Sequence, residues 1–487
     1  MSFLNRVPIR LRWIVFWGAL LRLFFVLVGA RVYYGSGNEF LNNDSRSYMG
    51  VMNLFEHGLY TFDMAHPDAP FGRVPTYPLF WGAHYLLFGE QGALYAVAAS
   101  QTLMDLAVIL MMFGLGRAVR GIDRDGLWAA FLYASYPFVI IWVSLTATEA
   151  FATFLTVAIA WVGMTRPPSL KTAALAGALI GAAVLTREYL GLMLLGLSLF
   201  QLMRLGWMRW PEAAKFITVM SAAFVVVFSA WPLRNYVFHS RVIVLRPENS
   251  GYHRYERDIT RSRAWINSWD IHADTYLDPM TKGDGEVPFP DEVFADASER
   301  AKAQELVALG RRCGAGFYSW RHNQAPPTSF ERCEGDVARG FDELRVSFMD
   351  REPLSFFVLT PARNLAKIFF KSSLTDRRGG FKRLLIAALF AYRSVLVLLG
   401  FVGAVVFRRR PIVVSIVAVS LSFYLFLCLV LRFVEMRYLL QFESLALIPV
   451  ALLCSALHGR FRLSGEQPTE DAPGHAPDGV APGSSID

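Results

Sequence analysis

Ten mostly apolar blocks, most of them close to 20 residues long, divide this chain of 487 residues and constrain its fold more than any other feature. A block of this length spans the hydrocarbon core of a bilayer as a helix, because a helix satisfies its own backbone donors and acceptors without water. The sequence therefore predicts an all-α, polytopic membrane protein with about ten transmembrane helices. The blocks cover approximately residues 11–30, 93–118, 126–144, 146–164, 172–185, 190–203, 216–237, 384–407, 412–431 and 439–457.

The composition agrees with a membrane protein. Hydrophobic residues make up 54% of the chain and charged residues only 18%, which leaves too little polar surface for a soluble protein of this length. The net charge is +8. Because the basic residues lie mostly at the ends of apolar blocks, membrane topology explains this charge better than nucleic-acid binding does. The lipid bilayer is the predicted partner, and nucleic acid is not.

Basic residues follow every second block, which fixes the predicted orientation. By the positive-inside rule, both termini are cytoplasmic and the protein is a multi-pass component of the cytoplasmic (inner) membrane. A cleavable signal peptide is the alternative for the first block. Against it, Arg22 interrupts the block and no small-x-small cleavage site follows.

The same orientation divides the chain into four predicted parts. An N-terminal membrane part (1–237, about seven helices) contains a first outer loop at 31–81, which is the predicted seat of catalysis. An extracytoplasmic region of mixed structure (238–383) is followed by a C-terminal membrane part (384–462, about three helices) and a disordered cytoplasmic tail (463–487).

Two stretches and two cysteines of the outer segments lead to further expectations. Residues 77–88 are too few to span a bilayer, and charges interrupt residues 354–370, so both are expected to be interfacial helices. Cys313 and Cys333 lie where an oxidising compartment permits a disulfide, although spacing alone does not show that they meet.

Three residues on the predicted outer side are candidates for chemistry. Asp44 follows the first block, where a carboxylate can act as a general base or, alternatively, cap a helix that starts at Ser45. Arg73 precedes two prolines and can bind a phosphate through paired hydrogen bonds, or simply extend into the headgroup region. Glu149 lies in an apolar run at a short outer turn, where an ionisable residue is either functional or in contact with water.

Other motifs are individually weaker. Arg187, Arg234 and Arg437 all fall on the same predicted side as Asp44, and this shared side is the informative feature. The sequence has no Gly-rich phosphate loop and no metal-ligand spacing, so no cofactor is expected, although a divalent metal remains possible. The acidic pair at residues 123–125 falls on the cytoplasmic side, where a helix cap is a simpler interpretation than a catalytic role.

The order of these motifs resembles the bacterial branch of the GT-C glycosyltransferases, which includes protein O-mannosyltransferases and the lipid A aminoarabinose transferase. The resemblance covers about residues 10–240 and 380–455, and each motif is short. It departs from many protein mannosyltransferases in having a lone Asp44 rather than an Asp-Glu pair. The matching features are Asp44 followed by Tyr48, the run from Arg73 to Pro78, Glu149, the Trp-Pro-x-Arg-Asn motif at 231–235, and Arg437-Tyr438.

The resemblance implies a function and roles for these residues. The protein would transfer a sugar from a polyprenyl-phosphate donor to an envelope lipid, glycan or protein acceptor on the outer face of the membrane, with inversion. Asp44 would be the catalytic base, and Glu149 would be a second acidic residue at the sugar or acceptor. Arg73, Arg187, Arg234 and Arg437 would bind the donor phosphate, and Tyr48, Tyr77 and Tyr438 would contact substrate.

Three other functions remain open. A polysaccharide polymerase or ligase also works on lipid-linked glycans outside the cell, but with a pyrophosphate-linked donor. A transporter is expected to have broken helices in corresponding halves and charges near the midplane, which the sequence does not show. A purely structural role would not explain why the candidate residues all fall on the same predicted side of the membrane.

Overall fold

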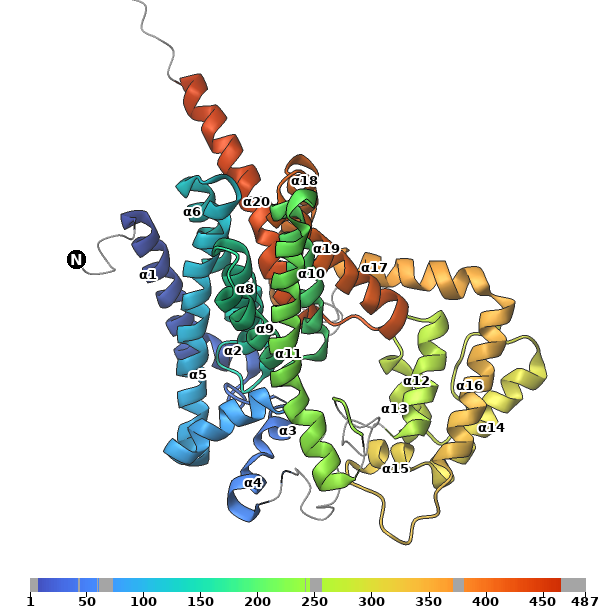
Figure 1. Ribbon diagram of the computed structural model, residues 1–487. Helices are drawn as coiled ribbons and strands as arrows, with labels where there is room; N and C mark the ends of the chain where they lie inside the picture. The colour runs from blue at the N-terminus through green and yellow to red at the C-terminus, as the bar shows by residue number, and fades with distance from the viewer. Residues whose placement is uncertain are drawn as a thin grey trace, which may run out of the picture.

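The computed structural model describes residues 8–42, 44–58, 60, 73–240, 242–245, 256–370 and 381–465. In these ranges every regular element is a helix, and the helices form a long bundle with a smaller group beside it (Figure 1). Eight helices of the described chain are long and apolar enough to cross a membrane. The prediction of an all-α, multi-pass membrane protein is confirmed, whereas the predicted tail at 463–487 lies almost wholly outside the described residues.

The bundle contains most of the helices. Its first and last helices, α1 and α20, begin and end at the same end of the bundle, and the short helices α3 and α4 lie at the opposite end (Figure 1). The bundle helices are α1 (Ile9–Phe24), α2 (Ala30–Tyr34), α3 (Ser45–Met49), α4 (Met52–His57), α5 (Thr76–Arg120), α6 (Asp123–Ala134), α7 (Pro137–Ile140), α8 (Thr148–Thr165), α9 (Leu170–Val184), α10 (Leu192–Leu205), α11 (Trp210–His239), α18 (Phe381–Val406), α19 (Pro411–Leu425) and α20 (Met436–Gly465).

One predicted transmembrane helix is not continuous. The block at residues 126–144 ends as a helix at Ala134, because Pro137 lacks a backbone N–H and forces the preceding residue, Tyr136, into an extended conformation. Irregular backbone at membrane depth needs protein partners. Gln101 of α5 provides them, since its side-chain amide donates hydrogen bonds to the backbone carbonyls of Val143 (3.2 Å) and Leu145 (2.8 Å). The prediction that residues 126–144 form one transmembrane helix is wrong for this reason.

A glycine divides α5 into two helices. Gly89 has φ 67° and ψ 178°, a conformation that side-chain-bearing residues rarely adopt, and the chain kinks there. The residues before it form the separate short helix expected at 77–88. The second stretch expected to be a helix, 354–370, forms a π-helical turn, η7 (Ser355–Leu359), and α17 (Thr360–Phe370).

Two ion pairs are buried among the apolar helices. Arg22 of α1 pairs with Asp105 of α5 at 2.5 Å, and Arg393 of α18 pairs with Glu443 of α20. Each acidic partner also accepts a hydrogen bond from a tyrosine hydroxyl. Charges inside a membrane protein are costly unless they are paired, so these contacts fix α1 to α5 and α18 to α20.

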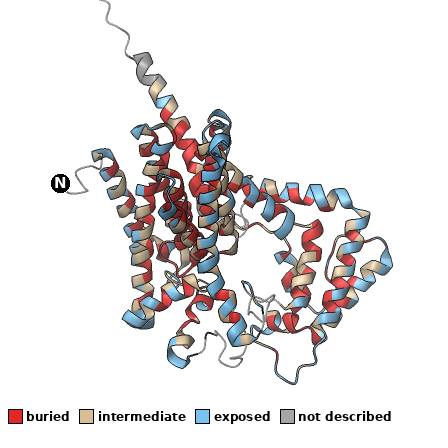
Figure 2. Ribbon diagram, viewed as in Figure 1, coloured by how far each residue is buried: buried red, intermediate tan, exposed pale blue. Residues whose placement is uncertain are grey.

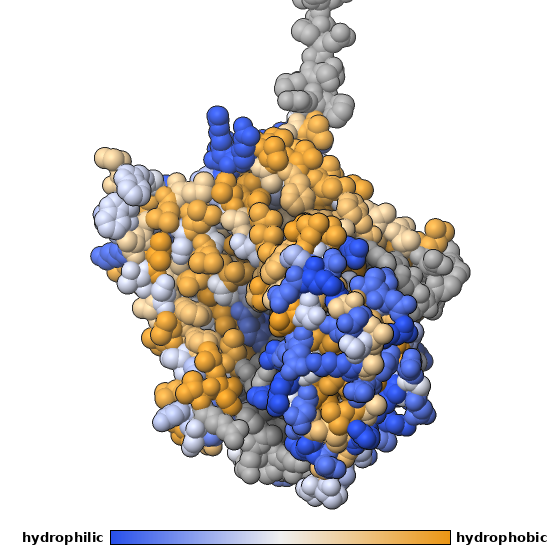
Figure 3. Space-filling view, turned by 90° about the vertical axis from the view of Figure 1, so that its right-hand side faces the viewer, coloured by the Kyte–Doolittle hydropathy of each residue, from blue (hydrophilic) through white to orange (hydrophobic). Residues whose placement is uncertain are grey.

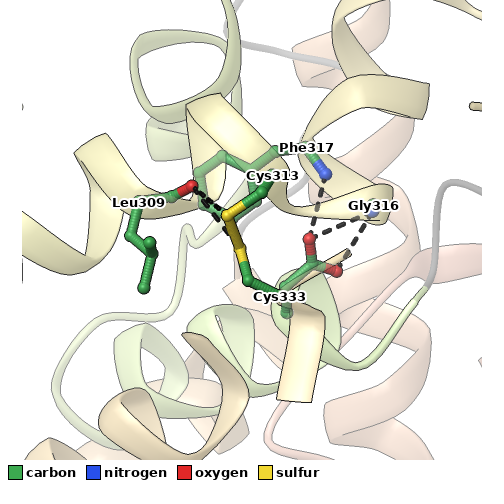
Figure 4. Close-up of a disulfide and its surroundings, with 6 residues drawn as sticks. Leu309, Cys313, Gly316, Phe317 and Cys333 are labelled. Carbon is green, nitrogen blue, oxygen red and sulfur yellow. Dashed lines mark hydrogen bonds between the residues drawn. A yellow bond between two sulfur atoms is a disulfide. The ribbon is translucent and has the colours of Figure 1, made fainter. Parts of the chain in front are cut away.

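The smaller group of helices, here called the polar unit (residues 256–351), has its own apolar core around Trp265 and Phe341. It is part of the region 238–383 that was expected to be of mixed structure, and its described elements are all helices. Cys313 and Cys333 form a disulfide (Figure 4), and closing a loop of this length stabilises a protein by about 3 kcal/mol. The helices of the polar unit are α12 (Arg257–Trp269), α13 (Asp274–Lys282), α14 (Ala297–Cys313), α15 (Ala315–His322) and α16 (Glu334–Arg351).

Burial and hydropathy separate the two parts. Buried residues gather in the centre of the bundle and between the helices of the polar unit (Figure 2). The outward faces of the bundle are largely hydrophobic, whereas the polar unit has a largely hydrophilic surface (Figure 3). Exposed apolar side chains such as Trp17, Phe24, Val226 and Phe238 lie on α1 and α11. This pattern is expected of a bundle surrounded by lipid and a polar unit surrounded by water.

Candidate active site

Asp44 immediately precedes α3, but it does not cap that helix. Its side chain makes no capping hydrogen bond. Instead Oδ1 of Asn42 accepts hydrogen bonds of 3.0 Å from the backbone N–H groups of Asp44 and Ser45. Because Asn42 satisfies the start of the helix, the Asp44 carboxylate is available to other partners.

Two arginines from distant parts of the chain bind the Asp44 carboxylate. Arg73, three residues before α5, donates from Nη2 to Oδ1 at 3.2 Å, and Arg437, in the first turn of α20, donates from Nη1 to Oδ2. Arg73 also donates from Nε to the Ser47 hydroxyl at 2.9 Å, and Arg437 pairs with Glu435. Arg73 is therefore part of a polar cluster and is not simply extended into the headgroup region.

The charges around Asp44 keep it ionised. Burial raises the pKa of the Asp44 carboxyl, but the positive charges of Arg437 and Arg73 outweigh this effect. A hydrogen bond from Arg437 and the charge of Arg187 act in the same direction, so the pKa lies below its usual value of 3.8. While both arginines are in place, Asp44 is a weak proton acceptor.

Glu149 forms a second ion pair. It is the second residue of α8, and its side chain is 1% exposed, so it is not in contact with water. Arg187, which follows α9, donates from Nη2 to Oε1 of Glu149 at 2.5 Å and from Nε to the Thr148 hydroxyl at 2.6 Å. The other carboxylate oxygen, Oε2, is buried and has no hydrogen-bond partner within the described chain. Such an oxygen is costly to bury, and it can accept a hydrogen bond from a bound ligand.

Tyr438 joins the two ion pairs. The guanidinium carbons of Arg187 and Arg437 each lie 5.2 Å from the centre of its ring, a distance at which cations are attracted to an aromatic face. The Arg187–Glu149 pair and the Arg437–Asp44 pair therefore belong to one site. This site is formed where the starts of α3, α5, α8 and α20 meet.

The other two predicted tyrosines lie on the Arg73 side of the site. The Arg73 guanidinium is 4.6 Å from the ring centre of Tyr48, and Tyr48 packs edge-on against Tyr77 at 5.1 Å. The Tyr77 hydroxyl donates to Gln101 at 3.1 Å, which connects the site to the irregular segment held by that glutamine. Eight of the nine residues predicted for the site are thus linked by direct contacts.

Arg234 is the ninth, and the structure does not bring it to the others. It lies near the end of α11, where its guanidinium carbon is 5.3 Å from the ring centre of Tyr60, 5.6 Å from that of Trp231 and 4.9 Å from that of Phe238. Its Nη1 donates to Asn235 at 3.1 Å. The described contacts include no hydrogen bond or ion pair from Arg234 to the site, so its role at a phosphate stays a prediction.

Three residues of the site were missed in the sequence. Ser47, Thr148 and Glu435 each hold one of the arginines. They are common polar residues, and the one signal for them is that each lies within three positions of a residue already singled out. The distances that make them relevant depend on the fold.

The acidic pair near residue 123 has a structural role. Asp123 and Asp125 lie in the first turn of α6 and form ion pairs with Arg117 and Arg120 at the end of α5. The expected helix cap is wrong, because the N-cap residue is Ile122 and no side chain makes a capping hydrogen bond there. In the described chain, no group of three or more His, Cys, Asp or Glu residues could hold a metal ion. Whether the protein needs a metal stays an open prediction.

Comparisons with known proteins identify the fold. No family model and no curated protein sequence matches the chain. The archaeal oligosaccharyltransferase AglB from Archaeoglobus fulgidus, solved with an inhibitory peptide and a dolichol-phosphate, matches 97% of this chain with a TM-score of 0.50 at 14% identity. A second oligosaccharyltransferase structure from that organism, tethered to an acceptor peptide, matches 92% of this chain with a TM-score of 0.46 at 12% identity.

The chain spans about half the length of these solved proteins, since it covers 53% and 50% of them. At 14% identity, the match to AglB is evidence for the fold alone. The match shows that this chain shares the overall fold of that archaeal oligosaccharyltransferase.

Proposed function

We propose that this protein transfers a sugar from a polyprenyl-phosphate donor to a hydroxyl of an envelope lipid, glycan or protein. The observation that carries the proposal is the pairing of Asp44 with Arg73 and Arg437. A carboxylate between two arginines supplies both groups that the reaction needs, a proton acceptor and a binding site for an anionic leaving group. The GT-C fold is consistent with this chemistry.

The reaction places different demands on the two kinds of residue. The bond between the sugar carbon and the phosphate oxygen breaks, and the lipid phosphate leaves as an anion that needs no general acid, since its second pKa is near 6. Arg73 and Arg437 offset the charge that develops on the phosphate oxygens. Asp44 takes the proton of the acceptor hydroxyl as its oxygen attacks the opposite face of the sugar, which inverts the configuration.

The two ion pairs of Asp44 imply an order of events. Both Asp44 oxygens are bonded to arginines, so the carboxylate is a poor base before the donor binds. A phosphate competes for the same guanidinium groups. We propose that the donor phosphate draws Arg73 and Arg437 toward itself and thereby raises the basicity of Asp44, so that deprotonation of the acceptor follows donor binding.

The Glu149 pair completes the proposal. The unpaired Oε2 of Glu149 is suited to accept a hydrogen bond from a hydroxyl of the donor sugar or the acceptor. Arg187 donates a hydrogen bond to Glu149 and faces the ring of Tyr438. A divalent metal is not required by this scheme, and an assay with chelator present tests that part of it.

We also propose that the site faces the outside of the cytoplasmic membrane. The turn at residues 408–410 joins α18 to α19 at the end of the bundle where α20 also ends, and α3, which follows Asp44, lies at the opposite end (Figure 1). Basic turns are expected on the cytoplasmic side. With the termini in the cytoplasm, the site formed by Asp44, Arg73, Glu149 and Arg437 lies on the side of the outer leaflet and its lipid-linked donors.

Substitution of Asp44 and Arg73 tests the assignment of roles. In proteoliposomes that contain polyprenyl-phosphate sugar, Asp44→Asn should lower kcat by about 100-fold or more, because the base is lost while the shape is kept. Arg73→Ala should chiefly raise the KM for the donor. Asp342→Asn, on an exposed face of the polar unit, is the matched control and should retain activity. Full activity of Asp44→Asn would remove Asp44 from the role of base.

A second candidate function comes from the structural comparison. The matching AglB is an oligosaccharyltransferase, and a lipid-linked oligosaccharide is also the donor of polysaccharide ligases. The same cluster of arginines could bind a pyrophosphate. The two functions differ in the donor that is consumed, and a direct comparison of donors distinguishes them.

A further inference from the structure

The turn that leads into α20 is the starting point. Arg437 reaches Asp44 from the first turn of α20, and residues 432–435 connect that helix to the π-helical segment η9 (Phe426–Leu431). Arg432 begins this turn with φ 51°, and in the described chain it is one of three non-glycine residues with positive φ. The left-handed conformation is unfavourable for arginine, so contacts elsewhere must hold it.

Those contacts come from the segment that joins the polar unit to α17. The Arg432 guanidinium carbon lies 3.6 Å from the ring centre of Phe356, and its Nη2 donates to the Phe356 carbonyl at 2.6 Å. Phe356 belongs to η7 and packs with the core of the polar unit. Arg432 is only 6% exposed, so it is clamped against this segment. Figure 1 shows the end of α19 reaching toward the polar unit beside α12 and α17.

The following residues of the turn contact the polar unit on one side and Arg437 on the other. The ring of Phe433 lies 5.4 Å from the guanidinium carbon of Arg263, in α12 of the polar unit. Glu435, at the end of the turn, pairs with Arg437. The turn is therefore held at Arg432 by η7, which packs against the polar unit, and at Phe433 by the polar unit itself, and it holds Arg437 through Glu435.

We propose that Arg432 is a positioning residue for the transfer reaction, which fixes the place of Arg437 by anchoring the turn 432–435 to the polar unit. The proposal rests on the proposed function of Arg437 at the donor phosphate. Binding of a phosphate by a guanidinium depends on its direction as well as its charge. Loss of the anchor therefore weakens donor binding, although Arg432 itself contacts no substrate.

The kinetic test compares two arginines that face the same ring. Arg345, in α16, lies 5.5 Å from the ring centre of Phe356 on the polar unit and is not part of the turn. In purified full-length protein, Arg432→Ala should raise the KM for polyprenyl-phosphate sugar about tenfold, the value of one charged hydrogen bond, with a much smaller change in kcat. Arg345→Ala should leave KM unchanged. Equal effects of the two substitutions would overturn the proposal, because they would indicate general damage to the polar unit.

Two further variants separate conformation from contact. Arg432→Gly adopts the left-handed conformation without strain but loses the contacts, so it should behave like Arg432→Ala; a wild-type KM would contradict the anchoring role. Phe433→Leu removes the second contact to the polar unit and should shift KM in the same direction.

Hydrogen exchange provides a measurement that is independent of activity. Arg432→Ala should speed amide exchange in residues 432–440, and Arg345→Ala should not. Unchanged exchange in Arg432→Ala would overturn the anchoring even if the protein used a different donor. A wild-type protein that transfers no sugar, together with faster exchange in the variant, would reject the proposed function and retain the anchored turn.

Discussion

Each oxygen of the Asp44 carboxylate is bonded to a different arginine, and in the proposed mechanism this double pairing decides when Asp44 can act as a base. In the free protein the arginines lower its pKa below 3.8, despite its burial. Proton transfer is most effective when the pKa of the base lies near the working pH. In the proposed mechanism, the same arginines therefore restrain Asp44 until the donor phosphate draws them away.

The pH dependence of the reaction tests this exchange. The pairing that lowers the pKa of Asp44 is present above pH 3.8 and is lost as the pH falls. The pH dependence of kcat/KM for the donor reports the free protein. Its acid limb should therefore lie below about pH 4. The acid limb of kcat reports the donor-bound protein and should lie at higher pH, because the arginines then face the phosphate. Both limbs are measured from pH–rate profiles in proteoliposomes.

Arg73→Gln serves as the control for that comparison. It removes one of the two charges that lower the Asp44 pKa, so it should move the limb of kcat/KM to higher pH and bring it closer to the limb of kcat. Identical limbs in the wild-type protein would mean that donor binding leaves the Asp44–arginine pairing intact.

At the scale of single residues, the sequence predicted which residues to consider but not how they are arranged. The order of the motifs and their shared position on the predicted outer side of the membrane led to Asp44, Arg73, Glu149 and Arg437. That Arg437 bonds to Asp44 could not be predicted, because 393 positions separate them and no local pattern records the distance. Asn42 caps α3 in place of Asp44 for a similar reason, since either residue type is a good cap.

At the scale of helices, buried ion pairs substitute for extensive packing. The window of α1 that can span a membrane is mostly unburied, and Arg22 fixes that helix to Asp105 of α5. Arg22 also donates to the Ala134 carbonyl at 2.9 Å, at the point where α6 ends. The sequence showed Arg22 as a charge in an apolar block, and its partner was not recognised. The sequence did contain a signal for this partner, because Asp105 is a charge of opposite sign in another apolar block.

A double-mutant cycle measures this pair. Asp105→Leu leaves the buried Arg22 charge without its carboxylate and should lower the free energy of unfolding by about 3–5 kcal/mol. Arg22→Leu combined with Asp105→Leu removes both charges and should restore most of that loss, because two apolar side chains need no pairing. Thermal unfolding in detergent checks the result. If the losses of the two single variants simply add in the double variant, the residues do not interact as described.

At the scale of the whole molecule, α20 connects the parts. It carries Arg437 and Tyr438 into the site, and Glu443 into the ion pair with Arg393 of α18. The turn that precedes it is bonded to Phe356, beside the polar unit. The apolar blocks predicted this bundle well, because membrane helices are specified by length and hydropathy. They failed at residues 126–144, where Pro137 and the Gln101 amide allow irregular chain inside the bundle. The helical polar unit was not predicted, since it has no blocks of that kind.

A direct comparison of donors tests the central claim. Purified protein in liposomes is given one labelled sugar on polyprenyl phosphate and the same sugar, differently labelled, on polyprenyl pyrophosphate, with an envelope extract as acceptor. Mass spectrometry then follows each label into lipid, glycan and protein fractions. The proposed function predicts transfer from the monophosphate donor with release of polyprenyl phosphate, and loss of that transfer in Asp44→Asn. Transfer from the pyrophosphate donor alone, or from neither donor, would contradict it.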